Sequence, residues 1–343
     1  MKAAIYRGER AIEIEEVDVP APEPGYVLLE MKRCGVCGSD LHSYFGEWGQ
    51  SAAASGHEVV GVVAECGEGV TNVMVGDRVC VECFSHCGGC RFCEMGDYNL
   101  CENLRGASGG NHSGFAEYVV AHASSLLHLP EGLSLDDGAL IEPLAVSYRA
   151  FYRTRAGYQD TVLVIGSGTI GLLAVAAAKA AGVRRVAATA RYAHQADMAG
   201  ALGADDVIRV ADGDVKAELL KVTDGLGADA VVETTASAQG FADALSAVRK
   251  GGAVVLVGGY HKPLSVHLGR IVGGEIRVTG SSCYGYSGVR KDFEWSMALI
   301  SSGKIPAGKL VTHRFPLEDI GAAFETASDK KTGSIKVMIH SNG

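Results

Sequence analysis

Four cysteines with short, regular spacing are the clearest chemical signal in the chain. Cys87, Cys90, Cys93 and Cys101 follow the pattern C-x2-C-x2-C-x7-C, with glycines in the intervening turns. Such loops allow four thiolates to converge in a closed tetrahedral shell, which is typical of a structural zinc. Free buried thiols, an iron–sulfur cluster and a DNA-reading zinc ribbon are the alternatives. We interpret residues 83–103 as a structural zinc lobe.

Ligand-type residues also lie upstream, in CGVCGSDLH (34–42) and in GHEVVGVVAECG (56–67). Cys37 offers a thiolate and His57 offers an imidazole. Taken alone they are weak evidence, because a lone histidine is more often a hydrogen-bonded core residue than a metal ligand. Their interpretation therefore depends on the other motifs of the chain.

A glycine-rich turn is the third chemical signal. The sequence predicts an apolar strand at 161–165 and an apolar helix at 172–182, joined by GSGTIG. A GxGxxG between a strand and a helix is the dinucleotide-binding fingerprint, because the helix N-terminus presents free N–H groups to a pyrophosphate. The predicted cofactor-binding positions of this turn are Gly166, Gly168, Thr169, Ile170 and Gly171.

Together, and in this order, these motifs resemble the zinc-dependent medium-chain dehydrogenase/reductase family of alcohol, sorbitol and threonine dehydrogenases. The segment Gly56-His57-Glu58, with glycines at 61 and 67, matches the zinc signature of that family. The resemblance extends over essentially the whole chain. It implies an enzyme that moves hydride between a nicotinamide ring and a secondary alcohol or its ketone.

The resemblance also implies the ligands of a catalytic zinc. Cys37 and His57 would bind the metal directly. Classical alcohol dehydrogenases use a second cysteine, but this chain has Glu142-Pro143-Leu144 at that place, as the sorbitol and threonine branches do. We favour Glu142 as the third ligand, with Glu58 as the adjacent alternative. Three such ligands leave one position open, where the metal lowers the pKa of a bound alcohol and the resulting alkoxide can expel hydride.

Residues close to Cys37 would handle the proton. Ser39 resembles the family's hydroxyl that touches the alcohol oxygen, and His42 resembles the terminal base of the proton relay. Asp40 resembles the carboxylate that orients the ligand histidine. Turn or capping roles for Ser39 and Asp40, and simple solvent exposure for His42, are the alternatives.

The end of the second nucleotide-domain strand indicates which cofactor is used. Enzymes that use NAD place an acidic residue there, to hold the ribose hydroxyls. Counting back from a helix-end landmark of the family at 202–204 gives Ala190, which is followed by Arg191. A small residue followed by a guanidinium would accept a 2′-phosphate. We therefore predict NADP(H), with NAD(H) as the alternative. Lys336 resembles a basic position that contacts the pyrophosphate.

Composition limits the classes of partner. The chain has 343 residues with 40 acidic and 31 basic ones, for a net charge of −9, which argues against nucleic-acid binding. It has no apolar run long enough to cross a membrane and no signal-peptide pattern at its start. We expect a cytoplasmic enzyme with two zinc ions per chain, a small alcohol or ketone as substrate, and a homotetrameric or homodimeric assembly as in the family.

Strand-like and helix-like segments predict how these residues are positioned. Short β-type runs dominate the first part, whereas apolar strands and helices alternate after it. We expect an α/β protein with two domains. A mainly β, GroES-like catalytic domain would comprise 1–144 and 286–343, and a Rossmann domain with a doubly wound parallel sheet would comprise 145–285. The active site would lie in the cleft where zinc meets nicotinamide.

The substrate is the least determined part. An alcohol, polyol or cyclitol dehydrogenase, an amino-alcohol dehydrogenase resembling threonine 3-dehydrogenase, and a non-catalytic zinc-binding relative are the three hypotheses. Aromatic candidates for the pocket wall, each of which could equally be core packing, are Tyr44, Phe45, Trp48 and Tyr284.

Overall fold

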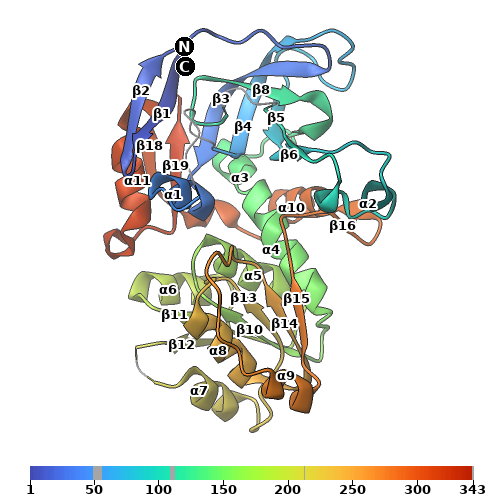
Figure 1. Ribbon diagram of the computed structural model, residues 1–343, viewed down its shortest axis with the longest axis vertical. Helices are drawn as coiled ribbons and strands as arrows, with labels where there is room; N and C mark the ends of the chain where they lie inside the picture. Colours follow the sequence, from blue (N-terminus) through green and yellow to red (C-terminus); the bar gives the residue numbers. More distant parts are fainter. Residues whose placement is uncertain (49–55, 109–112, 212, 342–343) are drawn as a thin grey trace. The chain divides into compact units, whose positions relative to one another are not determined.

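The chain forms two compact units in a computed structural model that describes residues 1–48, 56–108, 113–211 and 213–341 (Figure 1). Unit 1 comprises Met1–Glu142 and Ala307–Gly343, and unit 2 comprises Pro143–Pro306. One unit is therefore built from both ends of the chain, as the sequence predicts. The predicted return to it at residue 286 is too early, because the chain re-enters unit 1 only at Ala307.

Unit 1 is mainly β-structure, and α4 crosses its boundary with unit 2. Its strands are β1 (Lys2–Gly8), β2 (Ala11–Glu16), β3 (Tyr26–Gly35), β4 (Glu58–Cys66), β5 (Arg78–Val81), β6 (Phe84–Ser85), β7 (Arg105–Gly106), β8 (Tyr118–His122), β9 (Leu126–His128), β18 (Val311–Pro316) and β19 (Lys336–His340). Its helices are α1 (Gly38–Tyr44), α2 (Arg91–Glu94), α3 (Leu135–Ala139), α11 (Ile320–Ser328) and the start of α4 (Ile141–Thr154).

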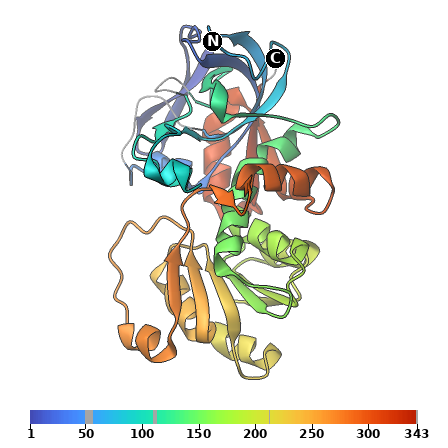
Figure 2. The ribbon, with the colours of Figure 1, turned by 90° about the vertical axis from the view of Figure 1, so that its right-hand side faces the viewer.

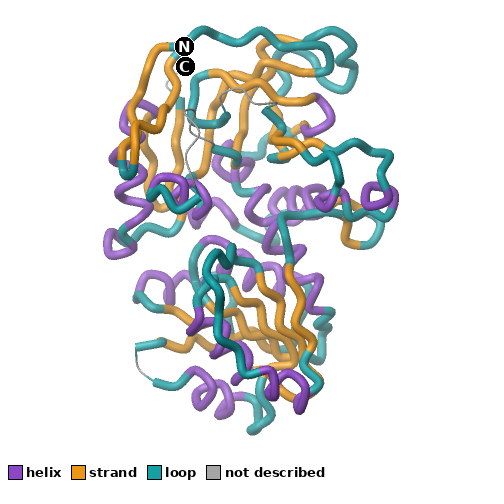
Figure 3. Tube along the Cα trace, in the orientation of Figure 1, coloured by secondary structure: helices purple, strands orange, loops and turns teal. Residues whose placement is uncertain are grey.

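The main sheet of unit 1 has seven strands among the described residues. Their order is β18-β19-β3-β4-β5-β9, and β8 pairs with β3 as well. Strands are drawn in orange in Figure 3. All pairings are antiparallel except that of β18 with β19. Alternating side chains of these strands enter a core that α11 closes, with Leu29, Met31 and Phe324 fully buried in it. β3, the longest strand, lies at the centre of this arrangement.

Unit 2 alternates strands and helices. Its strands are β10 (Thr161–Ile165), β11 (Arg185–Ala190), β12 (Asp206–Arg209), β13 (Ala228–Glu233), β14 (Val248–Leu256), β15 (Arg277–Gly280), β16 (Tyr286–Ser287) and β17 (Arg290–Lys291). Its helices are α5 (Thr169–Ala180), α6 (Ala193–Ala201), α7 (Val215–Val222), α8 (Ala238–Ala247), α9 (Leu268–Gly274), α10 (Asp292–Ser301) and the remainder of α4.

The main sheet of unit 2 is parallel, with the order β12-β11-β10-β13-β14-β15. α5 and α6 pack on β10, β11 and β12, whereas α8 and α9 pack on β13 and β14. Helices therefore cover both faces of the sheet (Figure 2). The chain order reverses between β10 and β13, which is where doubly wound sheets bind ligands at their carboxyl edge. The predicted Rossmann fold is confirmed.

α10 belongs to unit 2, contrary to the expectation that the chain has already returned by then. Arg149 of α4 lies 3.5 Å from Asp292, the first residue of α10, and both side chains are almost completely buried. Tyr148 of α4 also stacks on Trp295 of α10. These two contacts bind α10 to α4. The sequence alone does not show that Arg149 pairs with Asp292 or that Tyr148 packs on Trp295. Among the described residues, no helix is both long and apolar enough to cross a bilayer.

The glycine-rich turn after β10 leaves no room for larger residues. Gly166 has φ +95°, a conformation that favours glycine, and a Cβ atom on Gly171 would lie 1.7 Å from the Gly166 carbonyl oxygen. The first turn of α5 therefore packs directly on the backbone of the loop. Gly168 is the N-cap of α5, so the free N–H groups of the helix follow at once.

Replacing Gly171 by alanine should destabilise unit 2, because backbone rather than a flexible side chain would have to move. We expect Gly171→Ala to lower the free energy of unfolding by about 1–3 kcal/mol. Gly200→Ala is the matched control, since a Cβ there meets nothing within 4 Å and alanine favours a helix. Urea unfolding followed by circular dichroism measures both; equal midpoints for the two variants would contradict the close-packing argument.

Candidate active site and metal centre

The register of two neighbouring strands brings the upstream ligand-type residues together. β3 ends at Gly35, two residues before Cys37, and β4 begins at Glu58, directly after His57. The strands are antiparallel, and Gly35 lies opposite Glu58. The carboxyl end of β3 and the amino end of β4 are therefore adjacent, which places Cys37 beside His57.

Cys37, His57 and Glu58 form one of two groups of potential metal ligands among the described residues. One ligand atom from each residue lies within 4.8 Å of the other two. Thiolate, imidazole and carboxylate are donors that zinc accepts, and three protein ligands leave the open position that a catalytic site needs. The residues present therefore fit a catalytic zinc.

Asp40 contacts both the thiol-bearing residue and the histidine. Its Oδ2 accepts a hydrogen bond of 2.8 Å from the Cys37 N–H, and its Oδ1 lies 3.7 Å from His57 Nδ1. Burial by itself lowers the pKa of His57, but the charges of Asp40 and Cys37 more than offset this and raise it well above its ordinary value. Because Nδ1 faces Asp40, Nε2 is the ring atom left for a metal.

Glu142 lies nearby but is not a member of the ligand group. It is the second residue of α4 and is buried, at 6% exposure. Burial lowers the pKa of His57, and the Glu142 carboxylate is among the charges that raise it again. The carboxylate that the structure groups with Cys37 and His57 is Glu58. The geometry therefore favours the alternative third ligand over the one preferred from the sequence.

Lys336, at the start of β19, occupies a place that the sequence did not reveal. Its ammonium group donates to both carboxylate oxygens of Glu58 at 2.7 Å and to the Val36 carbonyl at 3.0 Å. Burial lowers the pKa of Lys336, but Glu58 more than compensates and raises it above its ordinary value. The three N–H donors of Lys336 are therefore used within unit 1 and its side chain is 2% exposed, while a contact with a cofactor pyrophosphate stays a prediction.

α1 carries the residues expected to handle the proton. Ser39 and His42 are three residues apart, so they lie on the same side of the helix. The His42 ring stacks on Trp48, with ring centroids 4.7 Å apart and planes 9° apart, and its Nδ1 is hydrogen-bonded to Glu47. Because a carboxylate only accepts, Nδ1 carries the proton and Nε2 is left as an acceptor. The sequence gives no signal for Glu47, since its contact depends on the loop that follows α1.

The aromatic candidates for a pocket wall differ in how far they are exposed to solvent. Tyr44 is buried, and its hydroxyl donates to Glu325 at 2.7 Å. Tyr284 is fully buried and packs edge-on against Phe293. Both are core residues, and Phe45 packs against the core of unit 1. Trp48 alone among the four is exposed, at 42%.

The residues expected to bind a dinucleotide meet at the carboxyl edge of β10 and β11 in unit 2. The Gly166 N–H donates to Thr189 Oγ1 at 2.9 Å, and Ser167 Oγ donates to the Thr189 carbonyl at 2.8 Å. These bonds tie the glycine-rich turn to the end of β11. Ala190 is the last residue of that strand and is buried, whereas Arg191 follows it and is exposed. Arg191 makes no ion pair with any described residue.

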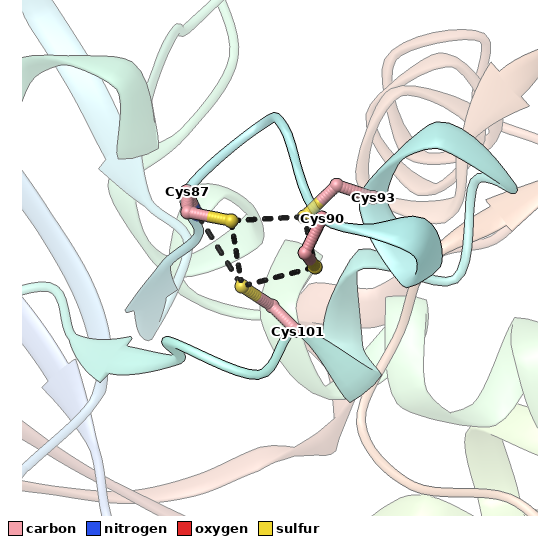
Figure 4. A group of neighbouring side chains, drawn as sticks. All are labelled: Cys87, Cys90, Cys93 and Cys101. Atoms are coloured by element: carbon pink, nitrogen blue, oxygen red, sulfur yellow. Dashed lines mark hydrogen bonds between the residues drawn. The ribbon is translucent and has the colours of Figure 1, made fainter.

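The second group of potential metal ligands is the four-cysteine cluster (Figure 4). The four sulfur atoms converge, with Sγ–Sγ distances of 3.5 to 4.0 Å. Zinc–sulfur bonds of ~2.3 Å in a tetrahedron would place the sulfurs about 3.8 Å apart. Backbone N–H groups lower the pKa of Cys90 to about 6, which favours the thiolate form that binds metal. The spacing suits one ion better than a multi-iron cluster, which would hold the sulfurs farther apart.

Comparison with known proteins agrees with both units. Residues 23–131 match the alcohol dehydrogenase GroES-like domain, and residues 169–302 match the zinc-binding dehydrogenase domain. Sorbitol dehydrogenase of Halalkalibacterium halodurans is 34% identical over 99% of both chains, and L-threonine 3-dehydrogenase of Pyrococcus abyssi is 34% identical over 95% of both. The chain belongs to the zinc-dependent medium-chain dehydrogenase family.

Two solved structures of similar dehydrogenases contain different cofactors. A zinc-binding dehydrogenase from Sinorhizobium meliloti, bound to NADP, has a TM-score of 0.89 and 29% identity, covering 99% of this chain and 98% of its own. An alcohol dehydrogenase from Escherichia coli, complexed with NADH, has a TM-score of 0.90 and 27% identity, covering 99% of both chains. This dehydrogenase is thus an oxidoreductase with the fold of zinc- and nicotinamide-dependent enzymes, and the family predicted from the sequence is confirmed.

In the zinc-free protein, removing the charge of Lys336 should destabilise unit 1 strongly, because Glu58 would then remain buried without a counter-ion. We expect Lys336→Met to lower the free energy of unfolding by roughly 3–5 kcal/mol. The exposed Lys331→Met should change it by no more than about 0.5 kcal/mol. Adding Glu58→Gln to Lys336→Met should restore part of the loss. Chemical unfolding measures all three; a Lys336→Met variant as stable as the control would show that the buried pair is not needed.

Proposed function

We propose that this dehydrogenase transfers hydride between NADP(H) and a secondary alcohol, polyol or cyclitol and the matching ketone. The observation that carries the proposal is the convergence of Cys37, His57 and Glu58 at one end of the β3–β4 pair. These three residues would hold the catalytic zinc, and Glu142 is the alternative third ligand. The cysteine lobe would hold a second, structural zinc, giving two ions per chain.

The chemistry is alcohol oxidation and its reverse. Bound zinc would supply Lewis acidity and the oxidised nicotinamide would accept a hydride, so that the alcohol loses a hydride from its carbon to the ring and a proton from its oxygen. The chain itself has to remove the proton. Ser39 would hydrogen-bond to the hydroxyl group of the substrate, and Nε2 of His42 would take up the proton and release it to water.

The surroundings of His42 suit that role. Its side chain is 39% exposed, so the ring can exchange protons with solvent. Glu47 accepts a hydrogen bond from Nδ1, which favours the tautomer that carries its proton there, and the stacked Trp48 restricts ring rotation. Asp40, hydrogen-bonded to the Cys37 backbone and close to His57, would keep both zinc ligands oriented.

We base the proposed preference for NADP(H) on the two residues at the end of β11. Ala190 offers no carboxylate to repel a 2′-phosphate, and the exposed guanidinium of Arg191 is placed to bind one. The hydrogen bonds of Thr189 to Gly166 and Ser167 support this proposal, because they put the end of β11 next to the loop that would face the pyrophosphate. The NADP-bound Sinorhizobium relative supports the proposal, while the NADH-bound relative supports the alternative.

The amino-alcohol hypothesis is the second candidate, favoured by the similarity to L-threonine 3-dehydrogenase. A screen of diols, polyols, cyclitols and L-threonine with each nicotinamide cofactor, followed by absorbance of the reduced ring, separates the two. A non-catalytic relative would reduce neither cofactor with any substrate class.

The cytoplasmic location stays a prediction. We also propose a homotetramer or homodimer, for which suitable contacts are the exposed Val272 and the edge of β15 that no described strand pairs with.

Zinc content tests the two metal sites separately. The protein as purified should contain two zinc ions per chain by mass spectrometry of the metal. Cys37→Ser should retain one ion, unfold near the wild-type temperature and lose at least about 1000-fold in kcat/KM. Cys90→Ser should also lose one ion but should unfold at a clearly lower temperature.

Cys66→Ser is the control, because Cys66 lies in neither ligand group of the described residues. It should keep both ions and full activity. Two ions in Cys37→Ser would disprove the proposed catalytic site.

Cofactor preference tests the assignment of Ala190 and Arg191. The double variant Ala190→Asp/Arg191→Ile should shift the ratio of kcat/KM for NADP⁺ over NAD⁺ by on the order of 100-fold towards NAD⁺, because it adds a repelling carboxylate and removes the phosphate partner. Lys250→Gln removes an exposed cation of unit 2 elsewhere and should leave the ratio unchanged. An unaltered ratio in the double variant would refute this part of the proposal.

A further inference from the structure

Unit 2 contains a cavity that is separate from the residues assigned to the cofactor. Its volume is about 470 Å³, within the usual range for small-molecule sites. α8 forms one wall, and the segment 264–267 with the start of α9 forms the other. None of the residues of the glycine-rich turn lines it, and neither Ala190 nor Arg191 does.

Apolar side chains form the interior of this cavity. Phe241 and Leu245 project from α8 and are nearly buried, while Leu264 and Val266 face them from the opposite segment. Such a lining favours a ligand with a hydrocarbon or aromatic body, because filling it removes apolar surface from water.

Basic residues line the cavity. Lys216 and Arg270 carry positive charge, His267 is the third basic residue, and no Asp or Glu is among the described lining residues. This composition is unusual for a chain with 40 acidic and 31 basic residues. The cavity therefore combines an apolar interior with basic side chains that form no ion pair with a described residue.

Two of the lining residues are held by neighbouring groups. Arg270 donates from Nε to the Leu245 carbonyl at 3.0 Å and from Nη2 to the Val248 carbonyl at 2.8 Å, at the end of α8. These hydrogen bonds go to backbone carbonyls, so the positive charge of the guanidinium is not neutralised by them. Phe241 packs edge-on against Tyr260, a residue outside the lining, whose hydroxyl is hydrogen-bonded to the buried Glu233. These contacts reduce the ordering of Arg270 and Phe241 that binding would require.

We propose that this cavity binds a small organic anion with an apolar body, such as an arylalkyl carboxylate. The apolar body would lie between Phe241 and Leu264, and the anionic group would face Lys216, His267 and Arg270. The inference goes beyond the dehydrogenase reaction and does not depend on it, so inactivity towards alcohols would leave it standing.

Binding of 4-phenylbutyrate tests the proposal, with its uncharged amide as the matched probe. Isothermal titration of the whole purified protein, with NADP⁺ at saturation, should give one site per chain and a dissociation constant on the order of 0.1–1 mM. The amide should bind at least tenfold more weakly. Equal binding of acid and amide, or displacement of the acid by NADP⁺, would overturn the proposal, because the probe would then be held without the cations or in the nucleotide site.

Substitutions locate the bound probe. Ala242→Phe places a ring in the cavity from an exposed position of α8 and should abolish binding, while Ala201→Phe, on the exposed end of α6, should not affect it. The double variant Lys216→Gln/His267→Gln should weaken binding at least fivefold, and Lys250→Gln should leave it unchanged. Wild-type affinity in Ala242→Phe would show that the probe binds elsewhere.

Discussion

The antiparallel register of β3 and β4 is the constraint on which the proposed metal site depends. Because Gly35 lies opposite Glu58, the residues just beyond the paired ends, Cys37 and His57, are brought together without any long loop. The approach is close: a Cβ atom on Gly35 would lie 1.8 Å from Glu58 Oε2. Only glycine leaves room for a carboxylate at that position, and the carboxylate is stable there because Lys336 from a third strand neutralises it. A shift of one residue would turn these side chains to the other face of the sheet.

The sequence predicts the parts that depend on local spacing. The glycine-rich turn, the four-cysteine lobe and the alternation of strands and helices in unit 2 were all recognisable, because turns and ligand loops involve residues close together in the chain. The choice between Glu58 and Glu142 was not, since it depends on how α4 and β4 approach each other. The contact of Lys336 with Glu58 could not be predicted for the same reason: a basic residue in a strand looks the same in the sequence whether it meets a phosphate or a buried glutamate. The chain re-enters unit 1 only after α10, because α10 is bound to α4 through the buried pair of Arg149 and Asp292. The hydrophobic pattern of the sequence does not predict this pair.

Buried carboxylates recur in this molecule, and Glu233 and Asp40 show how hydrogen-bond donors surround them. Glu233, fully buried at the end of β13, accepts hydrogen bonds from the backbone of Thr235 and Ala236 and from the Tyr260 hydroxyl. Burial and then Glu233 raise the pKa of Tyr260, so the hydroxyl keeps its proton and remains a donor. In unit 1, the fully buried Asp40 likewise accepts a hydrogen bond from the Cys37 N–H. Because an unpaired buried charge is costly, these groups fix loops more firmly than apolar contacts of the same size would.

The pairing of β3 with β19 has a consequence for synthesis on the ribosome. β19 (336–340) pairs with β3 (26–35), and all of unit 2 lies between these strands in the chain. While unit 2 is being made, the end of β3 therefore lacks this partner and Glu58 lacks Lys336. Unit 2 is continuous in sequence and can mature while the remainder is still being made. A nascent chain would expose part of the β3 edge during that interval, in which a chaperone could prevent edge-to-edge association.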